Sequence, residues 1–104
     1  MKDLKDVKKV YLLGIGGIGM SALARYFKGK GAKVSGYDKV SSPLTDQLIE
    51  EGIEVRFDES SEGLDEADLF IYTPAVPIDH IAFGYVQAAG NEWFKRSEVL
   101  EWIT

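Results

Sequence analysis

Residues 10–24 read VYLLGIGGIGMSALA, and this stretch decides the fold. The apolar run at residues 10–13 is typical of a buried strand, and the segment after the glycines has the apolar spacing of a helix. Between them, residues 14–19 match G-x-G-x-x-G in the strand–turn–helix context that gives this pattern its meaning. Glycine lets a ligand approach the backbone closely, and a helix start presents N–H groups and partial positive charge. We therefore predict a site for a phosphate or pyrophosphate group.

Patterning along the remaining sequence predicts an alternation of strands and helices. Further strands are expected at residues 33–37, 53–57, 69–72 and 92–94, separated by helices and by a loop with a helical turn near residues 63–64. Ser42 followed by Pro43 predicts a helix start, and Gly31 and Gly52 predict helix ends. This alternation predicts one α/β domain at residues 1–104, with a Rossmann-like, doubly wound, five-stranded parallel sheet in the order 3-2-1-4-5.

Apolar spacing also predicts the core-facing side of three helices. The expected inward residues are Ile18, Ala22, Leu23, Tyr26 and Phe27, then Leu44, Leu48 and Ile49, and then Ile81, Ala82, Tyr85, Val86 and Ala89. Phe83 falls off the last of these faces, beside Gly84, which costs about 1 kcal/mol in a helix interior. Either that helix is irregular or Phe83 contacts a partner.

Composition excludes several classes of protein. The 104 residues carry a net charge of −5 and no cysteine, which rules out disulfides, thiol nucleophiles and cysteine metal sites. The acidic balance argues against nucleic acid as a partner, because such binding needs a basic surface. No long apolar run or signal sequence is present, so no membrane contact is expected and a cytoplasmic location is favoured. The single histidine, His80, cannot hold a metal alone, and we expect it at the surface without a chemical role.

In a doubly wound sheet, ligands bind where the strand order reverses, at the carboxyl ends of the strands. The loops at residues 14–21, 38–42 and 73–77 are expected to meet there. In the first loop, the predicted phosphate cradle comprises Gly14, Ile15, Gly16, Gly17 and Ile18, with the N–H groups of the last three as donors and the Ser21 hydroxyl beside them. Replacing Gly16 by valine should then block the cradle while the fold survives.

The other two loops predict contacts to the rest of the ligand. Asp38, about twenty residues after the glycines, could accept hydrogen bonds from a ribose diol and would repel a 2′-phosphate, which disfavours NADP. Lys39 and Ser41 could reach a phosphate, although a solvated surface role is equally open. Residues 73–77, TPAVP, form a stiff loop that can pack against a flat base or sugar, unless its prolines only end the strand.

The sequence shows no catalytic set of residues. It has no Ser-His-Asp arrangement, no paired carboxylates with a shared site, no metal cluster and no G-x-x-x-x-G-K-[ST] loop for ATP. We therefore predict a binding domain with no catalytic residue, metal or cofactor of its own, which holds one substrate while another part of the protein performs the chemistry.

Three further segments make the pattern more specific. GYD at residues 36–38, YTPAVP at residues 72–77 and KRSEVL at residues 95–100 follow the glycine segment in this order. Together they resemble the N-terminal domain of the Mur ligase family, in particular of the members that add L-alanine to UDP-N-acetylmuramate. The resemblance covers nearly the whole chain, and its most specific part is the string GIGGIGMS at residues 14–21.

The resemblance implies a role in peptidoglycan synthesis, and through the cell wall in cell shape and cell division. In this family the N-terminal domain holds the UDP part of the nucleotide sugar, a central domain binds ATP with Mg²⁺, and a C-terminal domain brings the amino acid. The residues carried over by the resemblance are Gly16, Gly17 and Ile18 for the diphosphate, and Asp38, Thr73, Pro74 and Ala75 for the uridine.

Two features depart from the family pattern. The sequence ends at Thr104 before any ATP loop, so we expect a piece of a longer enzyme in which residues 95–98 lead toward the central domain. Residues 57–59 lack the histidine that many members have after the third strand, which weakens the expectation of a ligand contact from this loop.

Two other hypotheses remain open. An NAD-binding Rossmann module would explain the glycines and Asp38 equally well, but it gives the TPAVP loop no role. A noncatalytic interaction domain would leave the glycine loop empty and would use Phe83 or Trp102 as a contact surface.

Overall fold

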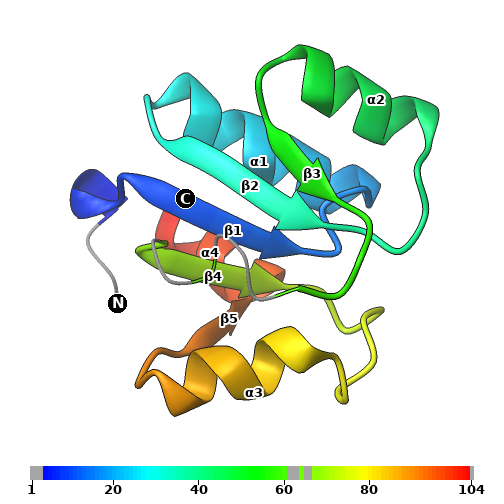
Figure 1. Ribbon diagram of the computed structural model, residues 1–104. Coiled ribbons are helices and arrows are strands. Elements are labelled where there is room, and N and C mark those ends of the chain that lie inside the picture. The colour runs from blue at the N-terminus through cyan, green and yellow to red at the C-terminus, as the bar shows by residue number, and fades with distance from the viewer. Residues whose placement is uncertain (1–3, 61–63, 65–66, 104) are drawn as a thin grey trace.

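Five parallel strands form one sheet at the centre of the computed structural model, which describes residues 4–60, 64 and 67–103. In spatial order they are β3 (Glu54–Arg56), β2 (Lys33–Tyr37), β1 (Lys9–Leu13), β4 (Leu69–Tyr72) and β5 (Trp93–Lys95) (Figure 1). Leu13 at the end of β1 pairs with Tyr37 of β2 and Tyr72 of β4, so the three central strands end together. The predicted fold class and strand order are confirmed.

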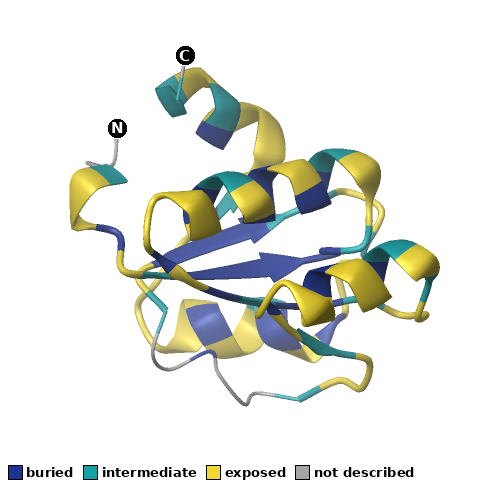
Figure 2. Cartoon of the chain, turned by 90° about the horizontal axis from the view of Figure 1, so that it is seen from above, coloured by how far each residue is buried: buried dark blue, intermediate teal, exposed yellow. Residues whose placement is uncertain are grey.

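Helices cover both faces of the sheet (Figure 2). They are α1 (Ile18–Gly29), α2 (Pro43–Glu50), α3 (Ile81–Ala88) and α4 (Arg96–Ile103), preceded by a short 3-10 turn at Leu4–Asp6. Side chains alternate along β1: Val10 and Leu12 pack in the core with α1, α2 and α4, whereas Tyr11 and Leu13 pack in a second core with α3. Both faces of the central strand are therefore buried, as a doubly wound sheet requires.

The helix boundaries follow the predicted signals. Ser42 caps α2, because its Oγ accepts a hydrogen bond from the Thr45 N–H at 3.1 Å and its own N–H donates to the Thr45 hydroxyl at 2.8 Å. Gly31 and Gly52 follow α1 and α2 with φ of +91° and +92°, a conformation that favours glycine. The helical turn expected near residues 63–64 falls outside the described residues, apart from Leu64.

The observed core face of α1 is rotated from the predicted one. Ile18 is 85% exposed and Ala22 also faces solvent, so both predictions are wrong. The buried apolar residues of α1 are Met20, Leu23, Ala24 and Phe27. Their spacing is i, i+3, i+4 and i+7, which gives one narrow stripe over the sheet and leaves Ile18 beside the glycine loop.

The predicted faces of α2 and α3 are partly wrong for a related reason. In α2, Ile49 is 45% exposed, and the fully buried Thr45 takes the inward place beside Leu48. In α3, Ala82 and Val86 are buried, but the exposed residues include Ile81, Tyr85 and Ala89. Both helices have eight residues, so each contacts the sheet along a line of only two side chains.

Phe83 packs inside the domain. Its ring centroid lies 5.3 Å from that of Trp93 and 5.3 Å from that of Tyr72, both in edge-to-face geometry. Tyr11 also meets Trp93 edge-to-face at 6.2 Å. Such pairs stabilise a core beyond the area they bury. The question left open by the sequence is answered by this aromatic cluster, which accounts for Phe83 without a partner.

Gly36 in β2 lies against β1 and the start of the glycine loop. A Cβ at this position would overlap the Leu12 carbonyl oxygen and would come within 2.8 Å of the Ile15 Cδ1. We expect Gly36→Ala to lower the free energy of unfolding by about 2 kcal/mol or more. Gly84→Ala is the control, because a Cβ there meets no atom within 4 Å, and it should raise stability by up to about 1 kcal/mol. Equal midpoints of urea unfolding for the two variants would contradict the close approach.

Burial raises the pKa of Tyr11 from 10.0 to about 12; Arg56 lowers the pKa by a smaller amount, and Tyr37 and Asp58 raise it slightly. The pKa of Tyr11 is higher in the folded protein than in the unfolded chain, so the neutral hydroxyl contributes to stability. That contribution is complete at pH values below the unfolded pKa, and it is lost as pH rises through the folded pKa. Between pH 9 and pH 11, we expect urea unfolding to show a loss of about 1 kcal/mol that Tyr11→Phe removes. An unchanged pH dependence in Tyr11→Phe would contradict this assignment.

Candidate functional site

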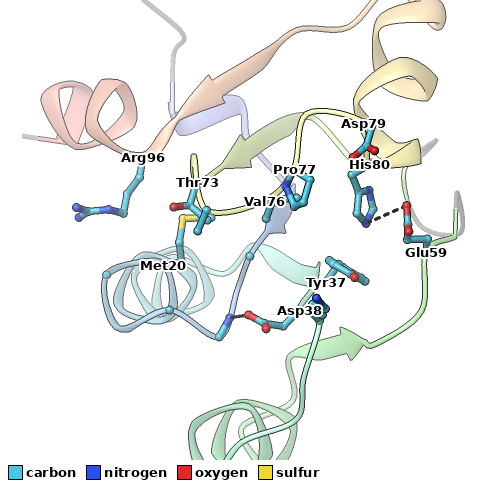
Figure 3. Close-up of a pocket in the computed structure, with 16 residues that line it drawn as sticks. Met20, Tyr37, Asp38, Glu59, Thr73, Val76, Pro77, Asp79, His80 and Arg96 are labelled. Atoms are coloured by element: carbon cyan, nitrogen blue, oxygen red, sulfur yellow. Dashed lines mark hydrogen bonds and ion pairs between the residues drawn. The ribbon is translucent and has the colours of Figure 1, made fainter.

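A pocket of about 640 Å³ opens at the carboxyl ends of the central strands. The glycine loop after β1, the turn after β2 and the loop between β4 and α3 line it, together with the start of α4 (Figure 3). Its volume lies in the range of small-molecule sites. The three loops that the sequence predicted to meet are therefore brought together at the point where the strand order reverses.

Hydrogen bonds to β2 hold the first half of the glycine loop. The N–H groups of Gly14 and Ile15 both donate to the Tyr37 carbonyl oxygen, at 2.8 and 2.9 Å. Gly14 has a φ of +94°, and a Cβ there would overlap the Thr73 methyl group. Ile15 is fully buried, with its side chain in the core. These two amides thus shape the loop and are already engaged within the protein.

Asp38 lies beside the glycine loop and binds it directly. Its Oδ2 accepts a hydrogen bond from the Gly16 N–H at 2.8 Å (Figure 3). A Cβ on Gly16 would lie 2.6 Å from that oxygen and 2.9 Å from the Thr45 methyl carbon. The close approach of Asp38 to the glycine loop explains why residue 16 is a glycine and why a carboxylate faces its N–H. It also argues against the expectation that Gly16→Val would spare the fold.

Helix α1 begins at the floor of the pocket. Gly17 is its N-cap residue and has no side chain to satisfy the first N–H groups of the helix. The Ser21 hydroxyl donates to the Ile18 carbonyl oxygen at 2.9 Å, and Ser21 is 2% exposed, so it faces away from the pocket. Two of the three predicted donors are engaged within the protein, because the Gly16 N–H donates to Asp38 and the Gly17 N–H donates to the Gly14 carbonyl oxygen at 3.3 Å. What the helix offers a ligand is therefore the backbone after Gly17 and the partial positive charge there.

The predicted site residues divide into two groups. Those that line the pocket are Gly14, Gly16, Gly17, Asp38, Lys39, Thr73 and Ala75. Those that do not line it are Ile15, Ile18, Ser21, Ser41 and Pro74. In the second group, Ile15 and Ser21 are buried, and the side chains of the other three are exposed outside the lining. Contacts of any of these residues with a ligand remain predictions.

Sequence reasoning missed Arg96 as a lining residue. It is the first residue of α4, and its guanidinium lies so close to α1 that a Cβ on Gly19 would sit 2.9 Å from the Arg96 Cζ. The strand order provided the signal, because β5 adjoins β4 and therefore delivers the residue after it to the same edge. The other lining residues not predicted as site residues are Gly19, Met20, Tyr37, Glu59, Val76, Pro77, Asp79 and His80.

His80 is buried, so the prediction of a surface histidine is wrong. Its Nδ1 accepts a hydrogen bond from the Ala82 N–H at 3.1 Å, which makes it the N-cap of α3. Glu59 supports the same helix start, because its Oε1 accepts a hydrogen bond from the Ile81 N–H at 3.2 Å. The ring is buried because Tyr37 packs against it edge-to-face, with centroids 4.5 Å apart.

Tyr37 presents a neutral hydroxyl at this end of the pocket. Burial raises the pKa of Tyr37, and the carboxylates of Glu59, Asp38 and Asp58 raise it further. The carboxylates of Glu59 and Asp79 make this end of the pocket acidic, and Arg96 lies at the other end (Figure 3). The Asp38 carboxylate lies between them, on the Gly16 N–H of the glycine loop. The pocket therefore has a cationic end beside α1 and an acidic, aromatic end beside α3.

Comparison with known proteins assigns the chain to a family. A family model described as "Mur ligase family, catalytic domain" matches residues 9–104. The chain belongs to the Mur ligase family. This Mur ligase chain is 52% identical, over 94% of its length, to a UDP-N-acetylmuramate–L-alanine ligase of Porphyromonas gingivalis. It is 46% identical, over 100% of its length, to the enzyme of the same name in Christiangramia forsetii. The aligned regions make up 23% and 25% of those relatives, so the chain spans about a quarter of their length.

Solved structures of Mur ligases share its fold. The UDP-N-acetylmuramate–alanine ligase of Thermotoga maritima matches with a TM-score of 0.83 and 30% identity, covering 88% of this chain and 21% of that one. A UDP-N-acetylmuramate:L-alanyl-γ-D-glutamyl-meso-diaminopimelate ligase from Neisseria meningitides matches with a TM-score of 0.78 and 29% identity, covering 89% and 30%. The family resemblance stated from the motifs is confirmed.

Two kinds of structure are absent from the described part of this Mur ligase chain. No helix there has the length and apolar character needed to cross a bilayer. No group of three or more His, Asp or Glu side chains in the same residues is arranged to hold a metal ion.

Gly16 and Gly17 differ in how they tolerate a side chain. A Cβ on Gly16 collides with Asp38 and Thr45, whereas a Cβ on Gly17 has its nearest atom at 3.7 Å. We expect Gly16→Ala to lower the free energy of unfolding by about 2 kcal/mol, and Gly17→Ala to lower it by under about 1 kcal/mol through weaker capping of α1. Urea unfolding measures both. If the two variants lose the same stability, the Gly16–Asp38 contact does not hold the loop.

Proposed function

We propose that this chain binds the UDP part of UDP-N-acetylmuramate within a ligase that adds L-alanine to it during peptidoglycan synthesis. The observation that carries the proposal is the cationic end of the pocket, where Arg96 lies against the N-terminal turn of α1 and its glycines. A helix N-terminus and a guanidinium both favour phosphate oxygens, and the glycines leave space for the diphosphate to reach the backbone. The names of the relatives aligned over this region support the choice of nucleotide sugar.

The adding reaction itself is assigned to other parts of the enzyme. The chain carries no ATP loop in its sequence and no group of described residues suited to a metal ion, so ATP and Mg²⁺ do not fit here. The relatives are about four times longer than the aligned region, which leaves ample chain for ATP-binding and alanine-binding domains. Within this division of labour, residues of the pocket bind and orient the nucleotide sugar, and the proposal gives none of them a catalytic role.

The main alternative ligand is NAD, which the glycines and Asp38 suggest equally from sequence. In the structure, Asp38 uses Oδ2 to hold the Gly16 N–H, which limits its contact with the ribose of either ligand equally. The TPAVP loop also lines the pocket through Thr73, Ala75, Val76 and Pro77. The lining by this loop favours the nucleotide sugar, because an NAD site gives the loop no role.

Ligand-induced thermal stabilisation tests this proposal on the chain itself, which contains a five-stranded sheet with a core on each face. UDP-N-acetylmuramate at about 100 times its Kd should stabilise the chain by about 2.7 kcal/mol, and so raise Tm by about 10 °C or more. NAD at the same concentration should have little effect. Stabilisation by NAD without stabilisation by UDP-N-acetylmuramate would overturn the proposal.

Gly17→Val is the matched blocking variant. Its side chain fits the backbone of residue 17, which has φ −67° and ψ 150°, but it occupies the pocket floor. We expect the variant to fold and to lose at least about tenfold in affinity for UDP-N-acetylmuramate, measured by titration calorimetry. Full affinity in this variant would remove the glycine loop from the site.

A further inference from the structure

The Nε2 atom of His80 is a buried polar atom that makes no hydrogen bond among the described residues, and its polar neighbour is the Glu59 carboxylate. The His80 side chain is 5% exposed and lines the pocket. Glu59 Oε1 lies 3.9 Å from Nε2, which is within the range of an ion pair but beyond hydrogen-bonding distance (Figure 3). Buried polar atoms are nearly always paired, so an unpaired one in a pocket wall points to a ligand.

The other ring nitrogen fixes what Nε2 can offer. Nδ1 accepts a hydrogen bond from the Ala82 N–H, and an imidazole nitrogen that accepts a hydrogen bond carries no proton. In the neutral ring, the proton is therefore on Nε2, which becomes a donor. The cap on α3 and the packing of Tyr37 at 4.5 Å hold the ring in place, so the direction of this donor is set before any ligand arrives.

The surroundings of Nε2 decide which part of a ligand it meets. The pocket lining beside His80 includes the carboxylates of Glu59 and Asp79, which repel phosphate, together with the flat apolar surfaces of Tyr37 and Pro77. The cation of Arg96 lies at the opposite end of the pocket, by α1 (Figure 3). A nucleoside diphosphate that follows this difference in charge binds with its phosphates by α1 and its neutral base by His80.

We propose that His80 is a specificity-determining residue whose Nε2–H donates a hydrogen bond to a carbonyl oxygen of the uracil ring. The proposal rests on the proposed function, and it names a base contact that sequence reasoning did not assign. The ring serves two purposes: Nδ1 caps α3, and Nε2 binds the base. A nucleotide whose base presents no acceptor at this place leaves the donor unpaired and binds more weakly.

Two substitutions separate the two nitrogens. The Oδ1 of asparagine takes the place of Nδ1 and keeps the cap, since asparagine is among the best N-cap residues, but no donor reaches the position of Nε2. In glutamine, the side-chain amide reaches the position of Nε2 and restores the donor, while the cap is lost. Variants His80→Asn and His80→Gln therefore have opposite defects, which a purely structural histidine would not show.

The experiment measures affinity for UDP and for ribose 5-diphosphate, which lacks the base, with Tm recorded for each variant. We expect His80→Asn to keep the parent Tm within a few degrees, to bind UDP about tenfold more weakly and to bind ribose 5-diphosphate unchanged. We expect His80→Gln to melt at a lower temperature and yet bind UDP within about threefold of the parent, measured well below its Tm.

Several outcomes would overturn the proposal. One is parent-like UDP affinity in His80→Asn, and another is an equal loss for UDP and ribose 5-diphosphate, which would place the contact on the sugar or the phosphates. A third is weaker UDP binding in His80→Gln than in His80→Asn, which would make the cap responsible. Failure of the parent chain to bind UDP-N-acetylmuramate would instead overturn the proposed function, so the two failures are distinct.

Discussion

The carbonyl oxygen of Tyr37 accepts two hydrogen bonds from consecutive amides of the glycine loop, and the rest of the site depends on this junction. The bonds fasten the loop after β1 to the end of β2, and the adjacent Asp38 carboxylate extends the attachment to Gly16. The N-terminus of α1 is thereby placed at the edge where β1, β2 and β4 end together. The main chain of β2 therefore positions α1, the helix that follows β1. The pocket is thus formed by the fold before a ligand binds.

This junction also explains which glycines are needed. Gly36 precedes Tyr37 and has no room for a Cβ beside Leu12, so β1 and β2 approach as closely as the paired amides require. Gly16 has no room for a Cβ beside Asp38, and Gly19 has none beside Arg96. A Cβ on Gly17 would make only ordinary van der Waals contacts, with its nearest atom at 3.7 Å. Within the glycine motif, Gly16 and Gly19 leave space for the side chains of Asp38 and Arg96, which face the pocket. Gly17 leaves space for the ligand.

The fold was predictable because its signals are local. The alternation of apolar runs with helix starts and stops, such as Ser42–Pro43 and Gly52, determines five strands and their crossovers, and the handedness of crossovers then leaves few strand orders. The rotation of α1 was not predictable from spacing alone, since Ile18 continues the apolar pattern at the start of the helix and is nevertheless exposed there. The aromatic packing of Phe83 was hidden because its partners, Tyr72 and Trp93, lie on β4 and β5.

The site was predictable where it follows from the strand ends, as for Gly14, Asp38 and Thr73. It was not predictable where distant segments deliver a side chain, as for Arg96 after β5 and Glu59 after β3, because no local pattern marks such a residue. His80 is the clearest case. A lone histidine at a helix start reads as a surface residue, and only the packing of Tyr37 against it shows that it is buried.

The acidic end of the pocket has a consequence for the kinetics of association. A chain of net charge −5, with carboxylates at one end of its pocket, repels an approaching anion at long range even though Arg96 and α1 attract it at contact. Salt screens the long-range repulsion over a Debye length of about 8 Å at physiological ionic strength, more effectively than it screens short contacts inside the pocket. Anionic nucleotides should therefore enter faster as ionic strength rises from low values, the reverse of the behaviour of basic phosphate-binding proteins.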